Sequence, residues 1–215
     1  LQKRMISLAR KMDKIVITAT QMMESMITNP VPTRAEVSDV ANAVLHGTEA
    51  VILSGETAAG KYPLETVIEM AQICAAAEAA EVVELDGDFT GLSFGRIDQS
   101  IALGALFTAY HLGAKAIVAL TESGSTALWM SRHRINIPIY ALTPQLATQR
   151  KLAMYRNVQP LLMASNFDRD SALSEAEEHL KARGIMGSGD VYAITCGEPM
   201  GAPGGTNMLK ICRAS

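Results

Sequence analysis

The sequence contains little cysteine, and its cysteines form no pattern typical of a bonded or metal-bound set. Cys74, Cys196 and Cys212 are odd in number and lie far apart in the chain. This excludes a disulfide framework and a cysteine-based metal site, because both need paired or closely spaced thiols. We interpret the three as buried thiols in a reducing compartment, and we expect a cytoplasmic location.

The sequence also lacks long apolar runs and clusters of basic residues. Residues 99–114 carry no Asp, Glu, Lys or Arg, but this stretch is too short and too polar to span a bilayer. The formal net charge is −3, with both signs interspersed along the chain. We therefore expect neither a membrane nor a nucleic acid as a partner.

What the sequence does contain is an alternation of helical and strand patterns in residues 1–77. Residues 15–18 and 50–53 are short apolar runs, and helical patterns precede, separate and follow them. Such alternation predicts a parallel sheet covered by helices. Two strands do not complete such a sheet, so we expect either part of a sheet continued later in the chain or the end of a larger barrel. The first helix begins without an N-cap residue, which favours a chain cut from something longer.

Two of these helices carry further local signals. Thr33 and Glu36 have the spacing of a capping box at the start of the second helix. Pro63 fits the first turn of the third helix. The apolar face of that third helix is predicted to comprise Leu64, Val67, Ile68, Ala71 and Cys74.

The periodicity fades over residues 78–98, where five acidic residues lie between positions 78 and 91, and we interpret this segment as a linker. Residues 99–215 then resume the alternation. Helices are expected at 99–112, 126–134, 145–155 and 170–183, and strands at 116–120, 139–142, 158–162, 191–195 and, at an edge, 208–212. This pattern predicts a separate α/β domain with a mostly parallel sheet of about five strands.

Polar side chains follow the first predicted strand directly. Thr18, Thr20 and Gln21 stand where the chain turns from strand to helix. In parallel α/β folds, hydroxyls at this position can donate to a substrate oxygen or pass a proton. They can equally cap the next helix, and the residues alone leave both interpretations open.

The second predicted strand also ends in polar groups, in the sequence SGETAAG at residues 54–60. Ser54 and Glu56 should therefore lie at the same edge of the sheet as Thr20. Glu56 could orient a proton relay, or it could only cap a helix or pair with a cation.

A third polar turn, TESGST at residues 121–126, joins a strand to a helix in the second domain. Its four hydroxyls and free N–H groups could hold a phosphate without a lysine. The alternative is an ordinary capped turn between a strand and a helix.

These segments resemble one known family. The block TATQMMESMITNPVPTRAEVSDVANAVLHGTEAVILSGETAAGKYPLETV resembles the C-terminal end of the pyruvate kinase barrel. TESGSTA and GGTNMLKI are similar to the C-terminal regulatory domain of that family. The resemblance implies an (α/β)₈ barrel of TIM type, of which residues 1–77 would supply the last two βα units, followed by the regulatory domain.

The resemblance also implies an activity, the transfer of a phosphoryl group from phosphoenolpyruvate to ADP, giving pyruvate and ATP in glycolysis. It implies Mg²⁺ and K⁺ as cofactors and a homotetramer as the intact assembly. Thr20 would contact the phosphoenolpyruvate/pyruvate site, and Thr20, Ser54 and Glu56 would be the catalytic residues of this chain. The family's catalytic lysine and magnesium carboxylates lie upstream of this segment, so we expect the 215-residue chain alone to be inactive. The alternative is a stand-alone module that binds a phosphorylated metabolite.

In the regulatory domain the resemblance implies an allosteric effector site at Thr121, Ser123, Gly124, Ser125 and Thr126. Ser125 stands where relatives often carry Lys or Arg. The later loop, residues 197–208, contains Glu198 and no basic residue that could hold a second phosphate. We therefore expect a sugar monophosphate or AMP, rather than a bisphosphate, as the effector.

Overall fold

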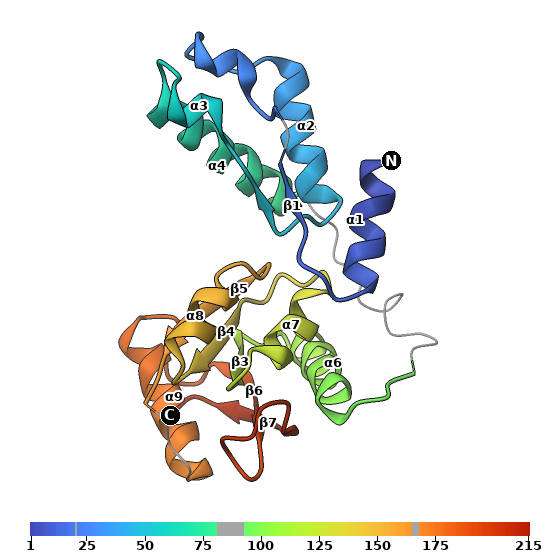
Figure 1. The fold of residues 1–215 in the computed structure, drawn as a ribbon. Coiled ribbons are helices and arrows are strands. Elements are labelled where there is room, and N and C mark those ends of the chain that lie inside the picture. The colour runs from blue at the N-terminus through green and yellow to red at the C-terminus, as the bar shows by residue number, and fades with distance from the viewer. Residues whose placement is uncertain (20, 81–92, 165–167) are drawn as a thin grey trace. The chain divides into compact units, whose positions relative to one another are not determined.

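The computed structural model describes residues 1–19, 21–80, 93–164 and 168–215 (Figure 1). The chain divides into two compact units, Leu1–Val82 and Val83–Ser215, and each is described by itself. Residues 81–92, which make up much of the predicted linker, lie outside the described residues. None of the described helices is long and apolar enough to cross a lipid bilayer.

The first unit alternates helices and strands in the predicted order. Its elements are α1 (Gln2–Lys11), β1 (Ile17–Thr18), η1 (Glu24–Ile27), α2 (Arg34–Leu45), β2 (Ala50–Val51), α3 (Gly55–Ala58) and α4 (Pro63–Ala79). The two strands are parallel neighbours, with Ile17 opposite Ala50 and Thr18 opposite Val51. The predicted helix after β1 is instead the short 3₁₀ helix η1, and the polar segment after β2 contains the one-turn helix α3.

The core of the first unit lies between η1, α2 and α4. The buried cluster consists of Met22, Met23, Met26, Val40, Ala43, Met70 and Ile73. The prediction for the buried face of α4 was wrong in part, because Leu64, Val67 and Ile68 are exposed, at 66%, 49% and 45%. The helix instead buries its Met70 and Ile73 side, which packs against α2 in this unit.

The predicted capping box at the start of α2 is confirmed, and it reaches further than the helix end. The Thr33 hydroxyl accepts a hydrogen bond from the Glu36 N–H at 3.3 Å, and the Glu36 carboxylate accepts one from the Thr33 N–H at 2.7 Å. The same carboxylate accepts bonds from the Ser25 N–H at 2.7 Å and from its hydroxyl. Partial burial raises the pKa of Glu36, but these hydrogen bonds outweigh it and lower the pKa to about 2.

Through these hydrogen bonds the charged Glu36 carboxylate connects η1 to α2, and protonation of the carboxylate at low pH weakens the connection. Because the pKa of Glu36 is lower in the folded chain than its ordinary value of 4.5, its contribution is complete above that pH and is lost as pH falls towards about 2. We expect a Glu36→Gln variant to be less stable by about 1–2 kcal/mol at pH 7, a value reduced for solvent screening. Urea unfolding measured from pH 7 to pH 2 should show this difference shrinking below about pH 4.5. A constant difference across the whole range would contradict the assignment.

The second unit contains one five-stranded sheet in the order β5-β4-β3-β6-β7. Its elements are α6 (Ile97–His111), β3 (Ala116–Leu120), α7 (Ser125–Ser131), β4 (Ile139–Thr143), α8 (Leu146–Leu152), β5 (Val158–Leu162), α9 (Arg169–Ala182), β6 (Val191–Gly197) and β7 (Thr206–Arg213). All neighbouring strands are parallel except β6 and β7, which are antiparallel. The predicted mostly parallel sheet of about five strands is therefore confirmed.

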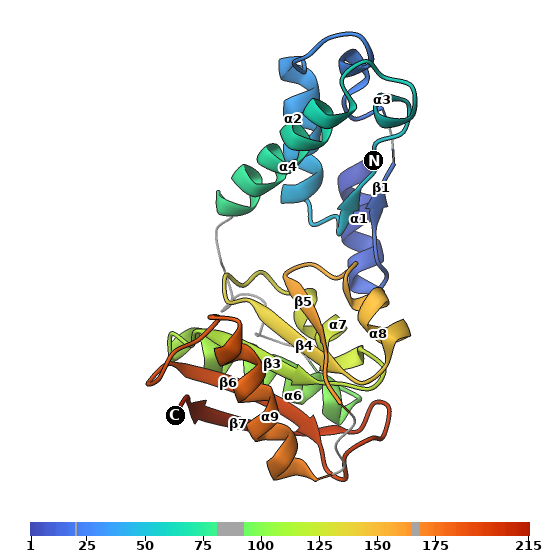
Figure 2. The same ribbon diagram turned by 90° about the vertical axis from the view of Figure 1, so that its left-hand side faces the viewer.

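Helices cover this sheet and create its core. Ala116, Val118 and Leu120 alternate along β3 and pack in one buried cluster with α9 residues such as Ala176 and Leu180. Helix α6 packs on β3, β6 and β7 and also against α7, and Figure 2 shows α9 and α6 on different sides of the sheet. Every residue of β3 is buried, as expected for the central strand of a covered parallel sheet.

Candidate functional site

In the first unit, the parallel pairing of β1 and β2 brings their carboxyl ends to one edge. The Thr18 hydroxyl, at the end of β1, donates to the Thr48 hydroxyl at 3.0 Å. Ser54 follows β2 and is exposed. Thr20, the predicted catalytic residue, lies outside the described residues. Its role therefore stays a prediction.

Glu56 connects the segments that follow the two strands. It is only 3% exposed, and its carboxylate accepts hydrogen bonds from the Met23 N–H at 3.2 Å and the Ser54 N–H at 2.8 Å. Burial raises the pKa of Glu56. Hydrogen bonds from its own N–H, Ser54 and Met23 lower the pKa by more than burial raises it, so the net pKa lies below the usual range. The charged carboxylate thus holds two backbone segments together. The sequence could not distinguish this from a helix cap or a cation pair.

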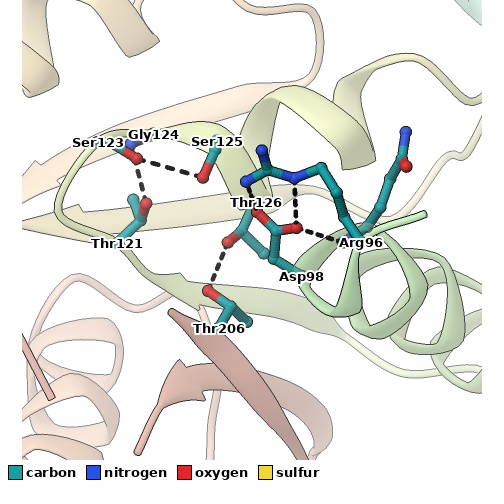
Figure 3. Close-up of polar contacts among 9 residues, drawn as sticks. Arg96, Asp98, Thr121, Ser123, Gly124, Ser125, Thr126 and Thr206 are labelled. Carbon is teal, nitrogen blue, oxygen red and sulfur yellow. Dashed lines mark hydrogen bonds and ion pairs between the residues drawn. The ribbon is translucent and has the colours of Figure 1, made fainter. Parts of the chain in front are cut away.

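In the second unit, the predicted turn at residues 121–126 is built by its own side chains (Figure 3). The Thr121 hydroxyl accepts from the Gly124 N–H at 2.9 Å, and the Ser123 hydroxyl donates to that of Ser125 at 3.2 Å. Gly124 has a φ of 81°, a left-handed conformation that favours glycine. Ser123 and Ser125 thus remain partly exposed on a turn that is fixed in shape.

Thr126 has a different environment from the rest of the turn. It is fully buried, and its hydroxyl shares a 2.6 Å hydrogen bond with the hydroxyl of Thr206 at the start of β7. This bond joins the turn to the end of the loop that connects β6 and β7. The chain thus brings together two segments that are 80 residues apart.

A small hollow lies between these two segments. Residues 120–122 line one side of it, and the other side is lined by Gly197, Met200, Gly201, Ala202, Gly204 and Thr206. Of these lining residues only Glu122 is charged. The hollow is thus bordered by both the turn and the β6–β7 loop.

An ion pair that sequence reasoning missed lies beside this loop. Asp98 is 2% exposed and accepts two hydrogen bonds from Arg96, from Nε at 2.9 Å and from Nη2 at 2.7 Å. These bonds lower the pKa of Asp98 more than burial raises it. Arg96 also lies over the Trp129 ring, 5.9 Å from its centroid, and Figure 3 shows the pair near Thr126. No spacing in the sequence links Arg96 to the distant turn, so only the fold could reveal it.

Among the described residues, no group of three or more His, Cys, Asp or Glu side chains could hold a metal ion. The described cysteines are all free thiols. Cys196 is buried, but Cys74 and Cys212 are only partly buried, so the prediction of three buried thiols was wrong in part. Burial raises the pKa of the Cys196 thiol, which disfavours its thiolate form. The described sites offer hydroxyls, backbone N–H groups, the buried carboxylates of Glu56 and Asp98, and the guanidinium of Arg96.

Comparison with known proteins places both units in one family. The profile of the pyruvate kinase barrel domain matches residues 1–67, and that of the pyruvate kinase alpha/beta domain matches residues 99–212. A solved structure of a pyruvate kinase from Cryptosporidium parvum aligns with a TM-score of 0.90 and 35% identity. The alignment covers 100% of this chain and 43% of that protein.

Curated relatives agree with the profiles. The chain is 47% identical over 214 residues to a pyruvate kinase of Buchnera aphidicola subsp. Acyrthosiphon pisum, covering 99% of this chain and 45% of that protein. It is also 47% identical over 212 residues to pyruvate kinase II of Salmonella typhimurium, covering 98% and 44%. The chain therefore spans slightly less than half the length of these relatives. It belongs to the pyruvate kinase family, of which it represents the end of the barrel and the C-terminal α/β domain.

Proposed function

We propose that this chain is the C-terminal part of an enzyme that transfers a phosphoryl group from phosphoenolpyruvate to ADP. The observation that supports this most is the parallel pair β1 and β2, whose carboxyl ends place Ser54 and Glu56 at one edge. In barrels of this type, ligands bind at the carboxyl ends of the strands. A coupled assay of pyruvate formation, on protein extended to the length of the relatives, tests the proposal.

We assign the side chains of this chain to the step that follows phosphoryl transfer, the protonation of the enolate. The bond from phosphorus to the enol oxygen breaks, and a bond from phosphorus to a terminal phosphate oxygen of ADP forms. The enolate that remains must take up a proton at its methylene carbon to become pyruvate. We assign Thr20 to the path of this proton and to substrate contact, with Ser54 as a second polar group. Glu56 fixes the segment around Met23 against Ser54 and so supports their geometry.

The pyruvate kinase family generally uses Mg²⁺ and K⁺, and we infer that the longer protein does so as well. In phosphoryl transfer, metal ions neutralise charge that develops on the transferred group. The described residues of this chain offer no cluster of acidic or histidine ligands for such an ion. The contribution proposed for this chain is therefore limited to orienting substrate and handling the proton.

The second unit is proposed as the effector-binding part, with a phosphate monoester as ligand. Thr121, Ser123, Gly124 and Ser125 would contact the phosphate, and Thr126, buried against Thr206, would anchor the turn. A rigid turn with several hydroxyl and N–H donors can bind a single phosphate without a net positive charge. Sugar monophosphates and AMP have this chemistry.

We expect ribose 5-phosphate or AMP to bind more tightly than fructose 1,6-bisphosphate. The hollow beside the turn has Glu122 as its only charged lining residue, and Glu198 lies in the adjoining loop. Glu122 should repel a second phosphate, whereas Glu198 is paired with Arg169 at 2.9 Å and should repel it less. Separate titrations, followed by the fluorescence of the single tryptophan, Trp129, measure the three affinities. Tighter binding of the bisphosphate than of either monophosphate would overturn this preference.

A gain-of-function variant provides the matched control for this preference. Ser125 is partly exposed at the start of α7, so Ser125→Arg adds a cation at the turn without changing the core. We expect this variant to bind fructose 1,6-bisphosphate several-fold more tightly than the parent, on the order of 1 kcal/mol. An unchanged affinity would indicate that the bisphosphate does not bind at this turn.

We also propose a cytoplasmic homotetramer for the intact protein. Helix α6 leaves apolar side chains exposed, with Ile97 at 69% and Phe107 at 44%, and Leu112 just after it is 53% exposed. Exposed apolar groups of this kind are typical of surfaces that contact another subunit. Sedimentation velocity of the extended protein would measure the assembly.

A further inference from the structure

We propose that Arg96 is a basic residue of the phosphate monoester site and supplies a cation from outside the turn and the β6–β7 loop. This inference rests on the effector site proposed above and adds a residue to it. Neither residues 121–126 nor residues 197–206 include a lysine or an arginine, and the turn has one contact with a cation, from Lys151 Nζ to the Ser123 carbonyl at 3.4 Å. Arg96 comes from the start of α6, far from both segments in sequence, and it lies against the loop at Gly204.

Arg96 can lie close to Gly204 because glycine has no side chain. A Cβ atom at Gly204 would lie 3.1 Å from Arg96 Nη2, which is closer than most Cβ contacts. Gly204 also has a φ of 69°, which favours glycine at this position. Gly204 also lines the hollow, so the guanidinium lies against a residue that borders it.

The guanidinium is held in one orientation. Asp98 binds the edge formed by Nε and Nη2, and the Trp129 ring lies beneath the guanidinium. The anchoring carboxylate is 2% exposed, whereas the arginine side chain is 55% exposed. A pair with these exposures differs from an ordinary surface ion pair, because the cation is presented to solvent by a buried partner. Because the side chain is already oriented, less conformational entropy is lost when a ligand binds to it.

The donors that Asp98 does not use are suited to a phosphate. An arginine has five N–H donors, and Asp98 engages one on Nε and one on Nη2. The opposite edge, formed by Nη1 and the second N–H of Nη2, is the one that binds phosphate through two parallel hydrogen bonds. Since the Arg96–Asp98 pair is neutral overall, the attraction comes from directed N–H groups. This favours one phosphate over two, in agreement with the expected monoester.

The position of Trp129 makes the proposal measurable. Trp129 is one helical turn after Ser125 on α7, and Arg96 lies over its ring, 5.9 Å from the centroid. A phosphate that draws the guanidinium toward the turn would change the environment of the indole. Ribose 5-phosphate should therefore alter the fluorescence of the 215-residue chain, and the change should depend on Arg96.

The variants distinguish the effect of the positive charge of Arg96, the effect of its hydrogen-bonding geometry and the effect of a loss of folding. Arg96→Gln alone leaves Asp98 buried without its partner, so the double variant Arg96→Gln/Asp98→Asn is used, because it removes both charges together. Arg96→Lys keeps a positive charge but loses the two-pronged edge. Arg169→Gln is the control, since Arg169 also pairs with an aspartate and contacts the same loop through Glu198 at 2.9 Å. Far-UV circular dichroism and thermal unfolding check that each variant is folded.

Binding of ribose 5-phosphate is measured by isothermal titration calorimetry and by Trp129 fluorescence. We expect the double variant to bind at least about tenfold more weakly than the parent, and Arg96→Lys to be intermediate. Arg169→Gln should stay within about threefold of the parent. Binding by the double variant within twofold of the parent, or an equal loss in Arg169→Gln, would overturn the role of Arg96. If the parent itself does not bind ribose 5-phosphate or AMP, the effector site proposed above fails, and the role of Arg96 fails with it.

Discussion

Replacing Thr20 by alanine is expected to lower kcat on the order of a hundredfold, in protein extended to the length of the relatives. A hydroxyl on the path of a proton acts mainly in the transition state, so its loss should change KM much less than kcat. Stopped-assay measurements of pyruvate formation across substrate concentrations separate the two constants. The predicted result is a large loss of kcat with KM within a few-fold of the parent.

Thr18 offers a matched control for this experiment on the same strand end. Its hydroxyl donates to Thr48 within the first unit, so Thr18→Ala removes a structural hydrogen bond. We expect that change to cost about 1 kcal/mol of stability and to leave kcat within about threefold of the parent. A Thr20→Ala enzyme with kcat within about twofold of the parent would show that Thr20 only caps the following segment.

The second unit was predictable from sequence because its strands are continuous apolar runs separated by helical patterns. The predicted bounds of β3 and β5 match the structure residue for residue. A buried parallel sheet requires such runs, and the intervening polar turns mark their ends. The predicted edge strand at residues 208–212 lies within β7, although its antiparallel direction could not be inferred from the residues.

The first unit was harder to predict, because the pattern of one helix does not identify its partner. The spacing of Leu64, Val67 and Ile68 indicated an apolar face on α4, yet the unit buries Met70 and Ile73 instead. An apolar stripe reports that something packs there, but not which element does so in a given chain. The capping box of Thr33 and Glu36 was predictable, since both partners are three residues apart.

The candidate sites show the same division between local and distant contacts. The turn at residues 121–126 could be proposed from sequence because its donors are adjacent. The Glu56 bond to Met23 spans 33 residues and the Thr126–Thr206 bond spans 80, so neither leaves a local pattern. Arg96 and Gly204 were brought together only by the packing of α6 beside the β6–β7 loop.

The most direct test of the account compares the 215-residue chain with protein extended upstream to the length of its relatives. Both are assayed for pyruvate formation from phosphoenolpyruvate and ADP, with Mg²⁺ and K⁺ present, by coupling to lactate dehydrogenase. We expect turnover by the extended protein and only background from the 215-residue chain, because the resemblance to the family implies that the catalytic lysine and the magnesium carboxylates lie upstream of this segment.

Turnover by the 215-residue chain that survives repurification would contradict the proposal that catalysis requires the part of the protein upstream of this chain. An extended protein that binds ribose 5-phosphate but forms no pyruvate would instead favour a module that only binds a phosphorylated metabolite. Pyruvate formation by the extended protein, lost on truncation to these 215 residues, is the result that the account predicts.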